Sequence, residues 1–356
     1  MNRFKLAVIL FLLTSCLVVG CSPQKDFSLA EPGPYEVGTL FVRAYKDSSR
    51  SDRAVNLTIW YPGVLPEGQE PADTNMNIEP DLQKAPYPLI LSSSTTGYTA
   101  FGNHLASYGF VVAGVNGMNP YDPWGDKLID YPLDILFALE QLASNPPEGL
   151  AGVIDTDNAG VIGYSFDGYN ALALSGARVD PEFYRNYCAN LPEMPPGLAW
   201  WPKYICAPAE DWDAFADHAG EALTNSNDGL WLPMTDERIR AAIPMGVEGY
   251  ALFGDQGLAP IDIPVMILHA TADEGNFYPF EAVPIFEALH NPDKVMISFI
   301  DEGHMMIFDE EPVHRMCHFA VAFFGYHLQG NSEFAKFFDE TYVDQYDDLA
   351  WGVYDQ

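Results

Sequence analysis

The sequence predicts an α/β protein built on a mainly parallel, doubly wound sheet. Short apolar runs of strand length alternate with stretches of helical spacing, first over residues 89–93, 102–108 and 110–115. Polar residues able to do chemistry follow several of these apolar runs, which is where sites collect in open α/β sheets. The chain has 356 residues and is 48% hydrophobic, so it is long enough for one large core.

The first elements are expected to form an antiparallel hairpin. Residues 35–43 and 54–61 are rich in β-forming side chains and flank a polar turn at 46–52. A loop rich in Pro, Glu and Asn follows over residues 63–85. Apolar residues at helical spacing then predict a helix over residues 134–144.

Later elements complete the alternation. Pro284 is tolerated only in the first turn of a helix, so the helix between the last two predicted strands should begin close to it. Residues 313–328 are expected to form a closing helix.

The start of the chain is predicted to be an export signal rather than part of the fold. Arg3 and Lys5 precede an apolar run, and small residues lead up to Cys21. This order is typical of a bacterial lipoprotein signal over residues 1–20, with lipid added to Cys21. Cys16 is a second candidate, and ordinary secretion is the alternative. We therefore expect an exported protein that meets a membrane only through a lipid anchor, with a tether over 21–33 and a folded domain over 34–345.

The net charge of the chain limits the classes of partner that it is expected to bind. The formal net charge is −33, which argues against nucleic acid and anionic membranes as partners. The acidic residues are scattered along the whole chain, as expected of a solvated surface suited to high salt.

The string Gly-Tyr-Ser-Phe-Asp-Gly over residues 163–168 carries the strongest functional signal. It follows the apolar run 159–162 and precedes a helical stretch over 169–174. A strand, a sharp turn with a serine and a helix together form a nucleophile elbow. Ser165 is therefore the candidate nucleophile.

An acid and a base follow in the order expected for a Ser, acid, His triad. The apolar run 263–269 leads to Asp273, and the run 295–300 leads to His304. A serine hydroxyl needs an imidazole to take its proton, and a carboxylate orients that imidazole. We assign His304 as general base and Asp273 as acid, with Glu274 and Asp301 as rival acids. His269, late in its strand, is expected to support the site.

An oxyanion hole is expected at two backbone N–H groups. The first is that of Phe166, the residue after the nucleophile. The second should come from the loop after the strand at 88–93, at Tyr98 with Thr96 as the alternative. The ring of Tyr98 would then line the cleft. Chemistry of this kind needs no cofactor, and no Cys/His spacing predicts a metal site.

Residues 175–236 break the α/β alternation and are interpreted as a cap inserted over the cleft. The segment is rich in Trp and Pro, and Trp200 and Trp201 are candidates for gripping an apolar or aromatic substrate. The alternative is that its tryptophans form the cap's own small core. Cys188 and Cys206 are expected to form a disulfide in an oxidising compartment, leaving Cys317 buried in a helix.

Taken together, these strings resemble the α/β-hydrolase superfamily over roughly residues 33–340. Within it they are similar to predicted dienelactone hydrolases and platelet-activating-factor acetylhydrolase-like esterases, neighbours of the cutinase-like polyester hydrolases. The strings that carry the resemblance are 33–38, 57–62, 97–100, 105–112, 236–242 and 263–265, together with the elbow. The nucleophile here is Ser165 where dienelactone hydrolase has Cys, so dienelactone chemistry is not implied. Asp167 and Ser94-Thr95 also depart from the family pattern; Asp167 either caps the following helix or lies near His304.

The resemblance and the triad imply an exported serine esterase acting through an acyl-enzyme on short-chain or aromatic esters. The alternatives are a phospholipase of the platelet-activating-factor acetylhydrolase type, a polyester hydrolase, and a non-catalytic binding lipoprotein that keeps the fold.

Overall fold

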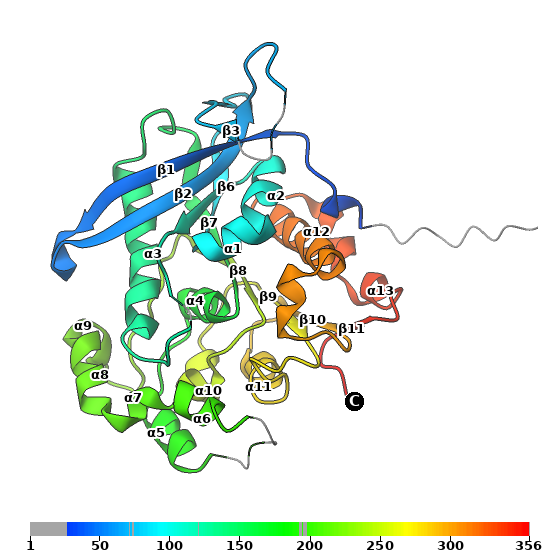
Figure 1. Ribbon diagram of the computed structural model, residues 1–356. Coiled ribbons are helices and arrows are strands. Elements are labelled where there is room, and N and C mark those ends of the chain that lie inside the picture. The colour runs from blue at the N-terminus through cyan, green and yellow to red at the C-terminus, as the bar shows by residue number, and fades with distance from the viewer. Residues whose placement is uncertain are drawn as a thin grey trace, which may run out of the picture.

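The computed structural model describes residues 27–355 except 71, 73–74, 120, 192–193 and 195–197. The predicted signal, the lipidation site Cys21 and most of the predicted tether lie outside the described residues. The described chain is a mixed α/β protein in which helices surround a large central sheet (Figure 1).

Eleven strands of the described residues form one sheet, in the order β11-β10-β9-β8-β7-β5-β6-β2-β1-β3, with β4 beside β2. The run from β10 to β6 is parallel throughout. Its strands are β5 (Tyr87–Ser93), β6 (Val111–Val115), β7 (Ile154–Tyr164), β8 (Ile239–Met245), β9 (Val265–Ala270) and β10 (Lys294–Phe299). The sheet is therefore mostly parallel, as the alternating sequence pattern predicts.

Antiparallel strands close both edges of the parallel run. The expected hairpin is present as β1 (Glu36–Asp47) and β2 (Arg53–Val64), and β2 joins the sheet antiparallel to β6. The short strands β3 (Asn75–Met76) and β4 (Glu79–Pro80) extend that edge. At the other edge β11 (Leu349–Trp351) pairs antiparallel with β10, so the folded part of the chain extends past residue 345.

Alternate residues of each strand point to opposite faces, so the sheet has two cores. Leu89 and Leu91 of β5 belong to one core, and Ile90 between them belongs to the other. The first core is covered by α3 (Lys127–Ser144), α4 (Phe166–Leu174), α10 (Tyr250–Leu258) and α11 (Ala282–Ala288). The second is covered by α2 (Gly102–Ser107) and α12 (Glu310–His327), which lie together in Figure 1.

Helix α3 begins seven residues before the predicted start at 134, because a proline inside it is tolerated. Pro132 has no N–H to donate to the carbonyl of Leu128, four residues earlier. The hydroxyl of Tyr169 donates to that carbonyl instead, at 2.7 Å. A contact from α4 thus satisfies the orphaned acceptor. In α11, Pro284 occupies the first turn, as expected.

Short helices separated by non-helical residues make up the described part of the predicted cap segment. It contains α5 (Pro181–Ala189), α6 (Trp201–Ile205), α7 (Ala207–Glu210), α8 (Trp212–Ala219) and α9 (Glu221–Thr224). The disulfide between Cys188 and Cys206 joins α5 to the residue between α6 and α7, which confirms the predicted pairing. Trp212, Phe215 and Trp231 pack on one another, so some tryptophans here form a local core.

The described N-terminal residues dock onto α12. Leu29, in the short helix η1 (Ser28–Ala30), donates its N–H to Nδ1 of His318, and the ring of Phe27 stacks on Tyr346. The end of the predicted tether is therefore packed against the domain. Cys317 is free and buried in α12, as expected.

The remaining described elements are short: η2 (Ser48–Arg50), α1 (Ser94–Thr96), the π-helical turn η3 (Gly97–Phe101), η4 (His304–Phe308), η5 (Ser332–Phe337) and α13 (Glu340–Val343). In the described part of the chain, none of the helices combines the length and apolarity needed to cross a membrane.

Candidate active site

Ser165 lies in a strained turn between β7 and α4. Its φ of 59° and ψ of −123° put a non-glycine residue in a rarely populated conformation. Its N–H donates to the carbonyl of Met245, at the end of the neighbouring strand β8, over 2.9 Å. A Cβ at Gly163 would come within 1.9 Å of the carbonyl oxygen of Asp167. Only glycine at that position lets the chain turn this sharply.

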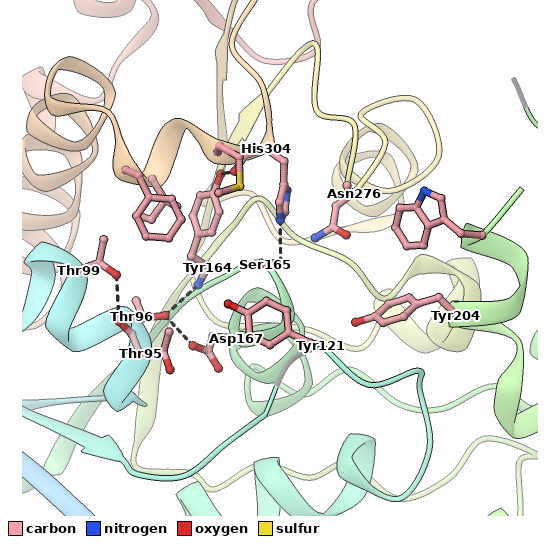
Figure 2. Close-up of a pocket in the computed structure, with 15 residues that line it drawn as sticks. Thr95, Thr96, Thr99, Tyr121, Tyr164, Ser165, Asp167, Tyr204, Asn276 and His304 are labelled. Atoms are coloured by element: carbon pink, nitrogen blue, oxygen red, sulfur yellow. Dashed lines mark hydrogen bonds between the residues drawn. The ribbon is translucent and has the colours of Figure 1, made fainter. Parts of the chain in front are cut away.

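The three predicted triad residues meet beyond the carboxyl ends of the parallel strands β7, β9 and β10. Oγ of Ser165 lies 2.9 Å from Nε2 of His304 (Figure 2). Nδ1 of His304 lies 2.9 Å from each carboxylate oxygen of Asp273. The structure thus brings together nucleophile, base and acid in one hydrogen-bonded chain.

Asp273 is held by its own turn. The buried carboxylate accepts hydrogen bonds from the N–H groups of Gly275, at 2.8 Å, and Asn276, at 2.6 Å. A Cβ at Gly275 would come within 2.7 Å of the His304 ring, so the acid's turn packs directly on the base. These bonds orient the carboxylate before any substrate arrives.

The surroundings of His304 favour the protonated, positively charged form of its ring. Burial by itself lowers the pKa of His304, but the hydrogen bond to Asp273 and its charge, with those of Glu248 and Glu274, outweigh burial, and the pKa is raised. A positive charge that develops on His304 during proton transfer is therefore stabilised by its surroundings.

The rival acids have other roles. Glu274 accepts the backbone N–H of His304 at 2.9 Å, so it holds the main chain of the base rather than its ring. Asp301 is exposed, has a φ of 61° and bonds through its N–H to the hydroxyl of Thr271. Neither carboxylate has a hydrogen bond to the ring of His304.

His269 supports the acid's turn. It is fully buried, accepts the N–H of Val247 at Nδ1 over 3.1 Å and bonds through Nε2 to the carbonyl of Asn276 over 2.7 Å. Burial lowers its pKa, against the charge of Asp273, so the neutral ring is favoured. The two bonds assign the proton to Nε2.

Asp167 fastens the nucleophile helix to the end of β5. Its buried carboxylate accepts hydrogen bonds from the hydroxyls of Ser93 and Thr96 and from the amide of Asn170. Burial raises the pKa of Asp167, although these hydrogen bonds oppose the rise. Two of its bonds therefore cross to the end of β5 and the start of α1, and the carboxylate bonded to the ring of His304 is that of Asp273.

A cavity of about 370 Å³ opens onto Ser165 and His304. Figure 2 shows Tyr121 and Tyr204 facing the triad from one side and Thr95, Thr96 and Thr99 from another. The exposed apolar side chains at its rim are Tyr121, Trp200, Met305 and Phe308. Trp200 thus lies where the sequence places it.

Two predicted substrate residues are not brought to this cavity. Strand β5 ends at Ser93 and a helix begins at once, so Tyr98 lies one turn further along, with its ring against Trp60 and its hydroxyl 3.2 Å from that of Thr58. Trp201 is fully buried and packs on Phe277 and Phe280.

The predicted second oxyanion donor, the N–H of Tyr98, lies in the π-helical turn η3 and outside the cavity lining. Thr95 lines the cavity in the first turn of α1, where backbone N–H groups have no partner inside the helix. The N–H of Thr96, the alternative, faces the hydroxyl of Ser93 at 3.4 Å. Phe166 is the first residue of α4, so its N–H is also in a first turn.

Several residues that line the cavity were not predicted from the sequence. Met305 and Phe308 directly follow the base in an apolar run, a signal that marks the wall beside it. Tyr121 and Tyr204 carry no local signal, because packing alone brings them to the site. In the part of the chain that the structure describes, no cluster of His, Cys, Asp or Glu is arranged to hold a metal ion.

No known protein-family model matches the chain, and a search of curated proteins finds no match either.

Proposed function

We propose that the protein is a serine carboxylic ester hydrolase of the α/β-hydrolase fold. The observation that carries the proposal is the hydrogen-bonded chain from Ser165 through His304 to the buried Asp273. Ser165 follows β7, Asp273 follows β9 and His304 follows β10. This is the chain order Ser, acid, His that the α/β-hydrolase fold uses.

The reaction would proceed through an acyl-enzyme. His304 takes the proton of Ser165 as Oγ attacks the ester carbonyl, and Asp273 holds the resulting imidazolium. The imidazolium then gives its proton to the leaving alkoxide. In the second half, His304 takes a proton from the water that attacks the acyl carbonyl, and the imidazolium then returns this proton to Oγ of Ser165 as the acid leaves.

The negative charge on the carbonyl oxygen needs two donors. The N–H groups of Phe166 and Thr95 are the best placed by chain position, since both lie in first turns that border Ser165 or the cavity. The hydrogen bonds that Ser93 and Thr96 donate to Asp167 support this pair, because they tie the start of α4 to the start of α1.

The cavity favours an uncharged, apolar or aromatic substrate. Among the described residues no Lys or Arg lines it, so a substrate carboxylate or phosphate would find no cation there. Tyr121 is 86% exposed and Phe308 69%, an unusual exposure for such large apolar groups beside a site. Both would be covered by a bound ester.

The helices α5–α9 would form the cap of this hydrolase. Trp200 and Tyr204 reach the cavity from α6 and its N-terminal flank, so this segment supplies one wall. The disulfide Cys188–Cys206 indicates an oxidising environment, in agreement with export. We retain the lipid anchor at Cys21 as part of the proposal.

The decisive experiment compares the wild type with Ser165→Ala on a short-chain p-nitrophenyl ester in high salt. Removal of the nucleophile should lower kcat/KM by about 10⁴-fold or more. Ser144→Ala, an exposed position at the end of α3, is the matched control and should keep full activity. A fluorophosphonate probe should label the wild type and not Ser165→Ala.

A folded wild type that neither hydrolyses esters nor reacts with the probe would refute the proposal and favour the binding lipoprotein. If activity is present, a panel of p-nitrophenyl esters, short-chain phospholipids and aromatic polyester fragments separates the candidate substrates. Because no Lys or Arg is among the described residues that line the cavity, neutral esters should be preferred over phospholipids.

A further inference from the structure

The turn between β8 and α10, residues 246–249, is hydrogen-bonded to the turn that carries Asp273. The carbonyl of Gly246 accepts from the side-chain amide of Asn276 at 2.6 Å, and Val247 bonds to His269. Both partners belong to the acid's own strand and turn. The position of the β8–α10 turn is therefore coupled to that of the catalytic carboxylate.

Glu248 is the one acidic side chain of this turn, and it is 1% exposed. Its Oε1 lies 3.3 Å from the hydroxyl of Tyr204, which lines the cavity. Its Oε2 is buried and has no hydrogen-bond partner of standard geometry among the described residues, although the indole N–H of Trp124 acts to lower the pKa of this carboxyl. A buried carboxylate with an unused oxygen is costly unless a nearby positive charge compensates it.

Two positive charges act on Glu248, those of Lys127 at the start of α3 and of protonated His304. The ammonium of Lys127 also lies 4.2 Å above the ring of Phe166, and burial lowers its pKa to about 8. Around His304, the carboxylates that act on the ring are Asp273, Glu248 and Glu274. Glu248 thus acts on His304 from the turn between β8 and α10, whereas Asp273 bonds to the ring from the turn after β9.

A second buried glutamate fixes the same turn but has a different role. Oε2 of Glu281 accepts the N–H groups of Gly249, at 2.8 Å, and Tyr250, at 2.9 Å. The charge of Glu248 raises the pKa of Glu281, whereas the carboxylates that raise the pKa of His304 are those of Asp273, Glu248 and Glu274. Glu281 therefore offers a control for loss of structure in this turn.

We propose that Glu248 is a positioning residue of the triad, whose buried carboxylate, held by Tyr204, stabilises the imidazolium form of His304 across the site. This role rests on the proposed esterase function. It gives the base two carboxylates: Asp273 orients the ring through hydrogen bonds, and Glu248 adds charge without touching it.

The sign of the effect follows from the charges. Burial raises the pKa of Glu248 to about 7, while the charges of Lys127 and His304 oppose the rise, so Glu248 changes its charge near neutral pH. Ionised Glu248 raises the pKa of His304. The free enzyme needs a neutral His304, so removing the charge should move the acid limb of kcat/KM to lower pH, by about one unit.

The experiment measures pH profiles of kcat/KM for the wild type, Glu248→Gln, Glu248→Asp and Glu281→Gln. In Glu248→Gln the acid limb should shift down by about one pH unit, and the plateau rate should fall about tenfold, because the transition-state imidazolium is less stabilised. Glu248→Asp should restore the limb. Glu281→Gln should leave the limb in place whatever it does to the rate.

An NMR titration of the His304 imidazole gives a readout that needs no turnover, with the signal assigned by its loss in His304→Gln. A lower imidazole pKa in Glu248→Gln supports the proposal. A slower variant with an unshifted imidazole and acid limb would overturn it, since Glu248 would then be merely structural. Absence of ester hydrolysis in the wild type with a shifted imidazole would refute the esterase function and leave the charge coupling standing.

Discussion

Two regions of the molecule supply the same cavity and are built in different ways. The turns after β7, β9 and β10 carry the triad, and each of these turns begins where a buried parallel strand ends. The α5–α9 segment supplies Trp200 and Tyr204 from short helices joined by a disulfide. The proposed chemistry thus depends on the register of the sheet, whereas the wall proposed to meet the substrate depends on how small helices pack.

This difference predicts that substitutions in the first region abolish turnover while the protein stays folded. Substitutions in the second should change stability or substrate affinity and leave the nucleophile reactive. The predictions below test that division, from the largest expected effect to the smallest.

Asp273→Asn should reduce kcat/KM by about 10⁴-fold, because an amide at this position no longer stabilises the imidazolium or sets its tautomer. Glu274→Gln is the matched control: it alters the neighbouring carboxylate, which bonds only the backbone N–H of His304. We expect a loss below about tenfold there. Steady-state kinetics on one ester measure both, and equal losses would mean that the acid is misassigned.

The adjacent tryptophans should separate stability from binding. Trp201→Ala empties a fully buried site against Phe277 and Phe280 and should cost about 3–5 kcal/mol in the free energy of unfolding. Trp200→Ala, at the exposed rim, should leave stability unchanged and raise KM several-fold. Denaturant unfolding and kinetics check the pair, and a stability loss at Trp200 would contradict the assignment.

Replacing both Cys188 and Cys206 by Ser should lower stability by about 3 kcal/mol, the effect expected for a closed loop of this length, where the sequence separation is 18. Because the triad lies on other elements, the fluorophosphonate probe should still label Ser165 in the folded variant. The two observables are the unfolding midpoint and the extent of labelling. Loss of labelling in a double variant that remains fully folded would show that the α5–α9 segment also shapes the turns that carry the proposed triad.

Much of the candidate site was open to prediction from the residues alone. The serine needs a tight turn, which Gly163 reveals, and the acid and base each follow an apolar strand. Asp167 was noticed as unusual, but its bonds to Ser93 and Thr96 join residues more than 70 positions apart, which no local pattern encodes.

Local pattern therefore set the α/β class, the parallel run, the order of nucleophile, acid and base, and the disulfide pair. These depend on strand periodicity, turn chemistry and cysteine count, which are readable along the chain. Packing settled what those patterns leave open: that Trp200 meets the cavity while Trp201 is buried, that Tyr98 lies beyond it, and that Glu248 lies within electrostatic reach of the base. The reason is physical, since side-chain direction and buried charge depend on neighbours distant in the chain.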